Sequence, residues 1–180
     1  MRASSRDASC DSGRLGVSAQ AGRAKEGSRV TASFTLRASV AAPIEVVFDV
    51  LTDHRGYANF TRFRSSTLEH EGEPPPNGVG AIRVFRFIGP PIREQVTAFQ
   101  PPTQFSYEAL SGVPARFLLG SVELVPEGER TSVKYRVETA AGIPMPDAMW
   151  GAGVRFVLSH LLKSAVKEAE RRAAGAESLR

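Results

Sequence analysis

Cysteine is almost absent from this chain of 180 residues, which contains a single one, Cys10. One cysteine cannot form a disulfide within the chain, and it cannot supply the clustered thiolates of a zinc site. A protein without a disulfide framework suits a reducing compartment. We therefore expect a cytoplasmic location.

Long apolar runs are missing as well. No stretch approaches the roughly 18 consecutive apolar residues of a membrane-spanning helix. Residues 1–30 also lack the apolar core, roughly 7–15 residues long, of a secretory signal peptide. We therefore expect no integral membrane segment.

Motifs that mark common chemistries are lacking too. The sequence has no G-x-S-x-G nucleophile elbow, no phosphate-cradling glycine loop and no Rossmann fingerprint. Its three histidines, His54, His70 and His160, fall on different predicted elements. We therefore expect neither a metal site nor a cofactor.

The excess of positive charge is confined to one end of the chain. The formal net charge is +4, and residues 1–30 hold six Lys or Arg against three Asp or Glu, which accounts for +3 of it. The remainder is close to neutral, so the basic composition does not indicate nucleic-acid binding. We expect no nucleic-acid partner.

Large apolar residues are scarce in residues 1–30, which are rich in Ser, Ala, Gly and Arg. Such a segment cannot bury enough surface to offset the entropy lost on ordering. We interpret it as a disordered extension, or as the result of a start codon assigned too far upstream, and the sequence leaves both open. The rest predicts one domain over residues 31–173 and a flexible tail over residues 174–180.

The chain does contain one long amphipathic segment, near its end. A helix over residues 147–172 gathers its large apolar side chains on one side and its charged ones on the other. Prolines precede it and Gly175 follows as its expected terminator. Gly151 and Gly153, near its start, predict a bend, a close approach to the backbone or a frayed first turn.

Before this helix, apolar and polar residues alternate in seven runs, as they do in strands. The runs cover residues 33–40, 63–71, 79–88, 92–99, 104–110, 116–125 and 131–139, with Gly and Pro between many of them. Residues 44–54 and 57–60, between the first two runs, suit two short helices. Consecutive strands joined by short turns form an antiparallel meander, and only the long helix has a stripe able to cover one face. The fold class is therefore α+β.

Five segments carry a family resemblance. They are ASVAAPIEVVFDVLTD at 38–53, GVG at 78–80, FQPPTQF at 99–105, GSVELVP at 120–126 and TSVKYRV at 131–137. With the closing helix they resemble the START/Bet v 1-like (SRPBCC) superfamily, and within it the bacterial polyketide cyclase/dehydrase-type proteins. The resemblance, over residues 34–172, implies a helix-grip fold: a seven-stranded curved antiparallel sheet wrapped around the long C-terminal helix, with a hydrophobic cavity between them.

The resemblance also bears on function, though less specifically. Members of this superfamily bind or transport lipids, sterols, polyketides and other apolar molecules, and a minority are aromatases, cyclases or hydrolases. The residues that would line such a cavity are mostly aromatic and aliphatic, and a buried phenol needs a partner that a ligand can supply. The candidate ligand contacts are Tyr57, Phe60, Phe63, Phe85, Phe87, Val96, Tyr107, Leu118, Tyr135, Trp150, Val154, Val157, Leu158 and Leu161.

Two charged residues have the alternation phase of the inward face. Arg83 shares the phase of Phe85, and Glu94 shares that of Val96. A solvated outer face is the alternative for each, but an inward pair would form an acid/base or binding device. With Tyr107, these two are the candidate catalytic residues. We interpret His54 as the surface end of a helix rather than as a base at the cavity mouth.

Three functions remain open at this point. The leading hypothesis is a carrier of an apolar or amphipathic small molecule, lipid- or polyketide-like. The second is a cyclase, aromatase or dehydratase that uses the same cavity. The third is a partner-binding module that acts through the outer sheet face. Outward-facing Ile82, Val84, Ile88 and Phe156 would form an association surface, so we expect a monomer or a homodimer.

Overall fold

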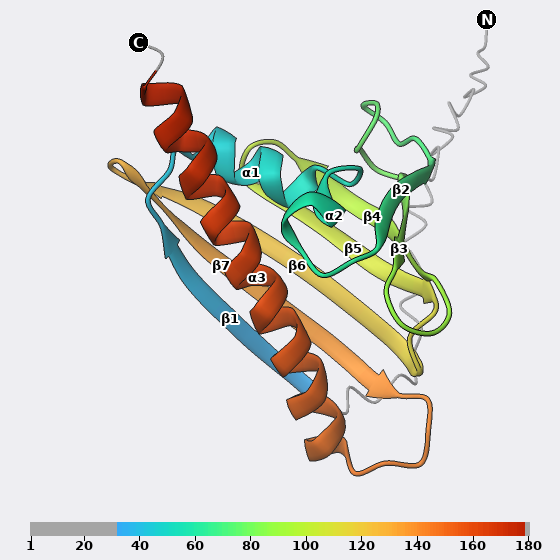
Figure 1. Cartoon of the computed structure of the whole chain (residues 1–180). Coiled ribbons are helices and arrows are strands. Elements are labelled where there is room, and N and C mark those ends of the chain that lie inside the picture. The colour runs from blue at the N-terminus through green and yellow to red at the C-terminus, as the bar shows by residue number, and fades with distance from the viewer. Residues whose placement is uncertain (1–31, 179–180) are drawn as a thin grey trace, which may run out of the picture.

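The described part of the chain, residues 32–178 of the computed structural model, is a seven-stranded sheet with two short helices and one long helix (Figure 1). The extension expected over residues 1–30 lies outside these residues. In chain order the elements are β1 (Ala32–Val40), α1 (Ile44–Thr52), α2 (Tyr57–Phe60), β2 (Ser65–His70), β3 (Ile82–Arg86), β4 (Ile92–Gln100), β5 (Gln104–Ser111), β6 (Ala115–Glu127), β7 (Arg130–Ala141) and α3 (Asp147–Glu177).

The sheet is an antiparallel meander from β2 to β7, and the first strand, β1, lies at its edge beside β7. The strand order is β1-β7-β6-β5-β4-β3-β2, and all neighbours are antiparallel. β1 pairs with β7, with Leu36 opposite Tyr135. The sheet curves, and α3 lies across its concave face (Figure 1). These observations confirm the predicted α+β helix-grip fold, including the two short helices between the first two strands.

One end of the space between sheet and helix is filled by α1. The Phe48 ring of α1 is buried edge-on against Phe105, at 6.2 Å between ring centres, and against Phe99, at 5.3 Å. Leu162 and Ala169, in the C-terminal half of α3, belong to the same core. This end is closely packed, so α1 limits how far a hollow can extend toward the C-terminal end of α3.

The long helix begins where predicted and ends later. α3 starts at Asp147 after Pro146 and runs past the predicted end at Arg172 to Glu177. Residues 174–177, predicted to belong to a flexible tail, are therefore helical. Gly175 does not end the helix, because the chain continues in right-handed conformation to Ser178, whose N–H donates to the Ala174 carbonyl.

Of the two glycines near the start of α3, one marks a close approach. A Cβ built at Gly151 would lie 3.0 Å from the Cβ of Ala32 in β1, whereas a Cβ at Gly153 would meet nothing within 4 Å. Gly151 thus lets the helix lie close against the edge strand. The helix is continuous over both positions, which excludes the frayed first turn among the three interpretations.

The hairpin of β2 and β3 is shorter than predicted. The strand expected over residues 79–88 covers only Ile82–Arg86, because Gly80 adopts a positive φ of 87° and Val79 forms an isolated bridge with Glu73. Val84, expected to face outward, is buried. Arg93 of β4 is the strand partner of Val84 and ion-pairs with Glu69 of β2, on the other side of β3, with 2.9 Å from Nε to Oε2. The Arg93 side chain therefore crosses β3 and covers Val84.

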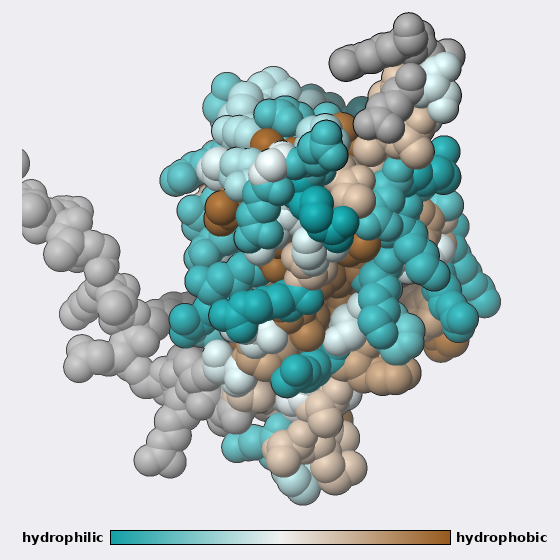
Figure 2. Space-filling model, turned by 90° about the vertical axis from the view of Figure 1, so that its left-hand side faces the viewer, coloured by the Kyte–Doolittle hydropathy of each residue, from teal (hydrophilic) through white to brown (hydrophobic). Residues whose placement is uncertain are grey.

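The side of the molecule shown in Figure 2 is largely hydrophilic. The side shown in Figure 2 carries polar residues over most of its area, with apolar ones between them and at the bottom, where Figure 1 places the connection from β7 to α3. Ile88 and Phe156, both expected to face outward, are exposed. No helix among residues 32–178 is long and apolar enough to cross a membrane.

Candidate functional site

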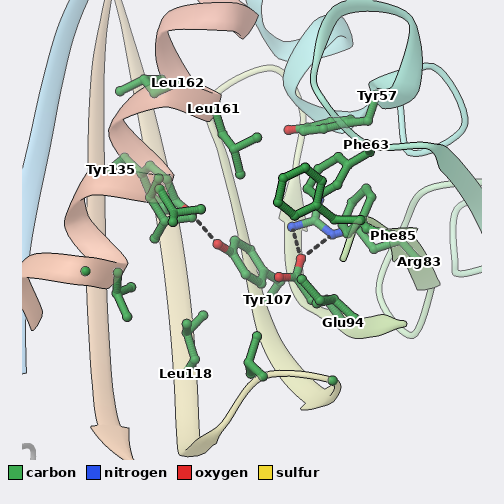
Figure 3. Close-up of a pocket in the computed structure, with 18 of the residues that line it drawn as sticks. Tyr57, Phe63, Arg83, Phe85, Glu94, Tyr107, Leu118, Tyr135, Leu161 and Leu162 are labelled. Atoms are coloured by element: carbon green, nitrogen blue, oxygen red, sulfur yellow. Dashed lines mark hydrogen bonds and ion pairs between the residues drawn. The ribbon is translucent and has the colours of Figure 1, made fainter. Parts of the chain in front are cut away.

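A cavity of about 490 Å³ lies between the N-terminal half of α3 and the concave face of the sheet (Figure 3). Its walls come from α3, from the strands β3 to β7 and the turns that join them, and from Leu51 of α1, Tyr57 of α2 and Phe63 after α2. Pockets of roughly 300–1,000 Å³ with mostly apolar walls are typical of small-molecule sites. The fold therefore leaves room for a guest molecule at the end that α1 does not fill.

The helix supplies a wall that is mainly aliphatic. All five α3 residues predicted as ligand contacts line the cavity: Trp150, Val154, Val157, Leu158 and Leu161. They share one side of the helix because they recur at three- and four-residue spacing. The Trp150 indole is oriented by its N–H, which donates to the Thr139 hydroxyl at 3.1 Å.

The opposite wall, at the end near α2, is aromatic. Phe63 stacks on Phe85 at 4.7 Å between ring centres, Tyr57 contacts Phe85 at 5.4 Å, and Phe87 meets Phe63 edge-on at 6.4 Å. These four rings line the cavity, as predicted. Phe87 is nonetheless 45% exposed, because it follows the last residue of β3 and lies at the cavity mouth.

An ion pair lies inside the cavity. Arg83 of β3 and Glu94 of β4 are direct partners in the strand register, and both line the cavity. The Arg83 Nε and Nη2 atoms each lie 2.8 Å from Glu94 Oε2 (Figure 3). Both side chains are almost fully buried, with 4% and 12% exposed. Burial raises the pKa of the Glu94 carboxyl, and the neighbouring Arg83 charge only partly opposes that shift.

The Arg83 guanidinium is also held by an aromatic ring. Its central carbon lies 4.4 Å from the centre of the Tyr107 ring, within the range of a cation–π contact. Tyr107 hydrogen-bonds through its hydroxyl to the hydroxyl of Tyr135 on β7 (Figure 3). Burial raises the pKa of both phenols, so both are protonated at neutral pH.

The position of Tyr107 depends on a glycine across the sheet. Gly120 of β6 is the strand partner of Tyr107, and a Cβ built there would lie 2.4 Å from two atoms of its ring. The ring therefore rests on the bare backbone of β6. The sequence predicts Gly120 only as part of a strand, and no local pattern indicates that a ring lies against it.

His54 is placed differently from the prediction. It was interpreted as a surface helix end, but it is fully buried behind Arg83. The turn after α1 folds inward because the His54 carbonyl accepts a hydrogen bond from the hydroxyl of Ser66 in β2. His54 Nδ1 lies 3.3 Å from Arg83 Nη1. Desolvation, followed by the charge of Arg83, lowers the pKa of His54 to about 2, so the ring is neutral.

Two predicted ligand contacts do not reach the cavity. Phe60 packs beside Tyr57, at 5.2 Å between ring centres, and against the closely packed core. Val96 is 1% exposed and is enclosed within the sheet wall. The other predicted contacts, including Leu118, line the cavity. Alternation gives the face on which a side chain lies, but it does not show whether a neighbour covers it.

About half of the lining was not predicted from the sequence. The missed residues come mainly from turns and from positions assigned to plain core, where no periodicity distinguishes a cavity wall from packing. They are Leu51, Ile92, Phe105, Gly112, Val113, Pro114, Val122, Met145, Met149, Gly153, Leu162 and Ala165. Within residues 32–178, no group of three or more His, Cys, Asp or Glu is placed to hold a metal ion.

A family model described as "Polyketide cyclase / dehydrase and lipid transport" matches residues 31–174 of the chain. No curated protein matches the sequence.

Solved structures share the fold at low sequence identity. A START superfamily protein from Mycobacterium smegmatis is 15% identical, with a TM-score of 0.67 over 80% of this chain and 98% of that one. The Zhui aromatase/cyclase from Streptomyces sp. R1128 is 23% identical, with a TM-score of 0.63 over 78% and 94% of the two chains. Norcoclaurine synthase from Thalictrum flavum is 14% identical, with a TM-score of 0.59 over 76% and 84%. At these identities the similarity concerns the fold.

Proposed function

Since the chain belongs to the polyketide cyclase/dehydrase and lipid transport family, we propose that it binds or carries a hydrophobic or amphipathic small molecule, lipid- or polyketide-like, in its internal cavity. The observation that carries this proposal is the cavity itself, about 490 Å³ between sheet and helix with mostly apolar walls. A ligand that leaves water for such walls gains roughly 25 cal/mol for each Å² of apolar surface buried.

The test is a pair of matched tryptophan substitutions. Leu161 projects into the cavity, whereas Leu119 is 40% exposed and absent from the cavity lining. Leu161→Trp should abolish the fluorescence that the apolar dye N-phenyl-1-naphthylamine acquires on binding, while Leu119→Trp should leave it unchanged. Equal dye binding by both variants, with circular dichroism showing both folded, would refute the cavity as the binding site and favour a function of the outer face.

The natural ligand can then be sought directly. Native mass spectrometry of the protein purified from its own source should show a bound small molecule that is lost on denaturation. The same molecule should be absent from purified Leu161→Trp and present in Leu119→Trp. If the wild-type protein carries nothing and the dye does not bind, the carrier proposal fails.

The second candidate is an enzyme of the cyclase, aromatase or dehydratase kind. It is favoured by one observation: Arg83, Glu94 and the linked phenols of Tyr107 and Tyr135 all border the cavity. A cavity that folds a flexible chain against an acid/base group would lower the entropy cost of ring closure. The two candidates differ in whether the captured molecule changes. A carrier returns it unaltered, a cyclase returns an isomer of the same mass that chromatography separates from the open chain, and a dehydratase or aromatase returns it short of one or more waters.

Two further expectations accompany the carrier proposal. We propose that the protein acts in the cytoplasm, on the basis of its single cysteine. We also propose that it works as a monomer or a homodimer, because the cavity is formed by one chain alone. Fractionation of the source cells and sedimentation of the purified protein test these two points.

A further inference from the structure

The charges in the cavity cancel. Of the residues that line it, only Arg83 and Glu94 are charged, and they bind each other through Glu94 Oε2. The nearby His54 ring is neutral, and the phenols of Tyr57, Tyr107 and Tyr135 are protonated at neutral pH. The cavity therefore presents no unbalanced charge to a guest molecule.

A charged guest would meet two obstacles. A carboxylate would have to compete with Glu94 for Arg83, and an ammonium group would have to compete with Arg83 for Glu94. Each ion would also lose its hydration on entering a cavity with apolar walls, and a buried ion without its own partner is strongly disfavoured. The ion pair thus disfavours the binding of both anions and cations in the cavity.

The cavity does offer hydrogen bonds to a neutral guest. Arg83 has five N–H groups; two are directed at Glu94 and one at His54 Nδ1, which leaves two without a partner among the described residues. The phenol pair uses one of its two O–H groups internally, so the other remains a donor. Glu94 Oε1 accepts no hydrogen bond from residues 32–178. A carbonyl oxygen can therefore accept from Arg83 or from the free phenol O–H, and a hydroxyl group can in addition donate to Glu94 Oε1 or to a phenol oxygen.

The polar groups are also gathered on one side. They come from the strands β3, β4, β5 and β7, whereas the side chains that α3 contributes are mainly aliphatic (Figure 3). A guest that satisfies both sides has an oxygen at one edge and an apolar skeleton at the other. Unpaired polar groups left facing an apolar guest would weaken binding, so the oxygen contributes to selectivity.

From these contacts we infer that the ligand is an uncharged molecule with a carbonyl or hydroxyl oxygen, held with that oxygen at Arg83 and Tyr107 and with its apolar skeleton against α3. This inference rests on the proposed ligand-binding function and narrows it to a chemical class. Free fatty acids and amines are excluded from that class, while neutral hydroxylated or keto ring compounds are included.

The test uses three probes with one anthracene skeleton: 9-anthracenemethanol, 9-anthracenecarboxylate and 9-(aminomethyl)anthracene. Trp150, the only tryptophan of the chain, lines the cavity, so quenching of its emission reports binding of each probe. At pH 7.5 the wild-type protein should bind the alcohol at least about ten times more tightly than the carboxylate or the amine. Tighter binding of either ion would overturn the inference but leave the cavity's function intact.

Glu94→Gln provides a second, directional readout. It removes the negative charge but keeps a group that can accept from Arg83, so the cavity gains an unbalanced cation. The affinity for the carboxylate should then rise at least about tenfold relative to the alcohol. Glu123→Gln removes a carboxylate from an exposed pair with Lys134 and should leave the ranking unchanged.

The possible failures are distinguishable. An unchanged ranking in folded Glu94→Gln would refute the role of the ion pair. If that variant does not fold, the wild-type ranking alone decides the inference. If none of the three probes and no N-phenyl-1-naphthylamine binds the wild-type protein, the proposed function itself fails, and the inference fails with it.

Discussion

The guanidinium of Arg83 lies over the ring of Tyr107, 4.4 Å from its centre, while Glu94 holds the edge of the same guanidinium at 2.8 Å. This stack joins three neighbouring strands, β3, β4 and β5, through side chains on the cavity side of the sheet. Tyr107 takes part in two interactions, the cation–π contact of its ring with Arg83 and the hydrogen bond of its hydroxyl with Tyr135, and substitutions at Tyr107 can separate them.

Tyr107→Phe and Tyr107→Leu should differ in stability. Phenylalanine keeps the ring over Arg83 and loses only the hydroxyl bonded to Tyr135, at a cost of about 1–3 kcal/mol for the phenol left unpaired. Leucine loses the ring as well, and should cost about 0.5–2 kcal/mol more for the cation–π contact. Urea denaturation measures both differences. Equal stability of the two variants would mean that the ring contributes nothing through Arg83.

Removal of the Glu94 charge should lower the free energy of unfolding much more than removal of one charge from an exposed ion pair. Glu94→Gln leaves the buried Arg83 without its counter-ion, and we expect the free energy of unfolding to fall by about 3–5 kcal/mol. Glu123→Gln, whose partner Lys134 is half exposed, should cost about 0–1 kcal/mol. Thermal and urea unfolding of the two variants check the difference. A small, similar loss in both would show that the inner pair is as solvated as the outer one.

Substitution by alanine at two glycines of the cavity region should change stability in opposite directions. At Gly120 the added methyl would lie 2.4 Å from the Tyr107 ring, so the ring must move and stability should fall by about 1–3 kcal/mol. At Gly153 the added methyl meets nothing within 4 Å, and alanine should stabilise α3 by up to about 1 kcal/mol. Calorimetric melting of Gly120→Ala and Gly153→Ala tests the signs. Destabilisation by both would contradict the open space at Gly153.

His54 should make the fold sensitive to acid. Burial lowers the pKa of His54 from 6.5 to about 2, so between these values the unfolded chain binds a proton that the folded chain does not. The free energy of unfolding should therefore fall as pH drops through 6.5, by about 1.4 kcal/mol between pH 7.5 and 5.5. The raised pKa of Glu94 acts in the opposite sense, since it favours the folded state at low pH.

A pair of histidine variants isolates the His54 contribution. His54→Gln removes the titrating group, so its stability difference from wild type should shrink as the pH is lowered from 7.5 to 5.5. His160 is exposed on α3, and His160→Gln should keep the wild-type pH dependence. A stability difference for His54→Gln that does not vary with pH would show that the folded and unfolded chains take up this proton at the same pH, and hence that burial does not lower the pKa of His54.

Periodicity predicted the fold well because the sheet and α3 each bury one continuous side. The two-residue repeat placed Arg83 and Phe85 together, and the helical repeat placed Trp150, Val154 and Leu161 together, and all of these line the cavity. Periodicity failed where contacts with distant parts of the chain determine whether a side chain is buried. Nothing local shows that the turn at His54 folds inward onto Ser66, or that Arg93 covers Val84. Met145 and Met149 were missed for the same reason, since they belong to a loop and a helix start with no alternation to follow.

Met145 and Met149 line the cavity and are also 36% and 61% exposed, so each touches both the interior and the solvent. Methionine is unbranched and polarisable and changes rotamer at little cost. A guest can therefore enter or leave past two adaptable thioethers, while every hydrogen bond of the sheet stays in place. For the carrier proposed above, exchange of the ligand past Met145 and Met149 would thus require side-chain motion and no opening of the sheet.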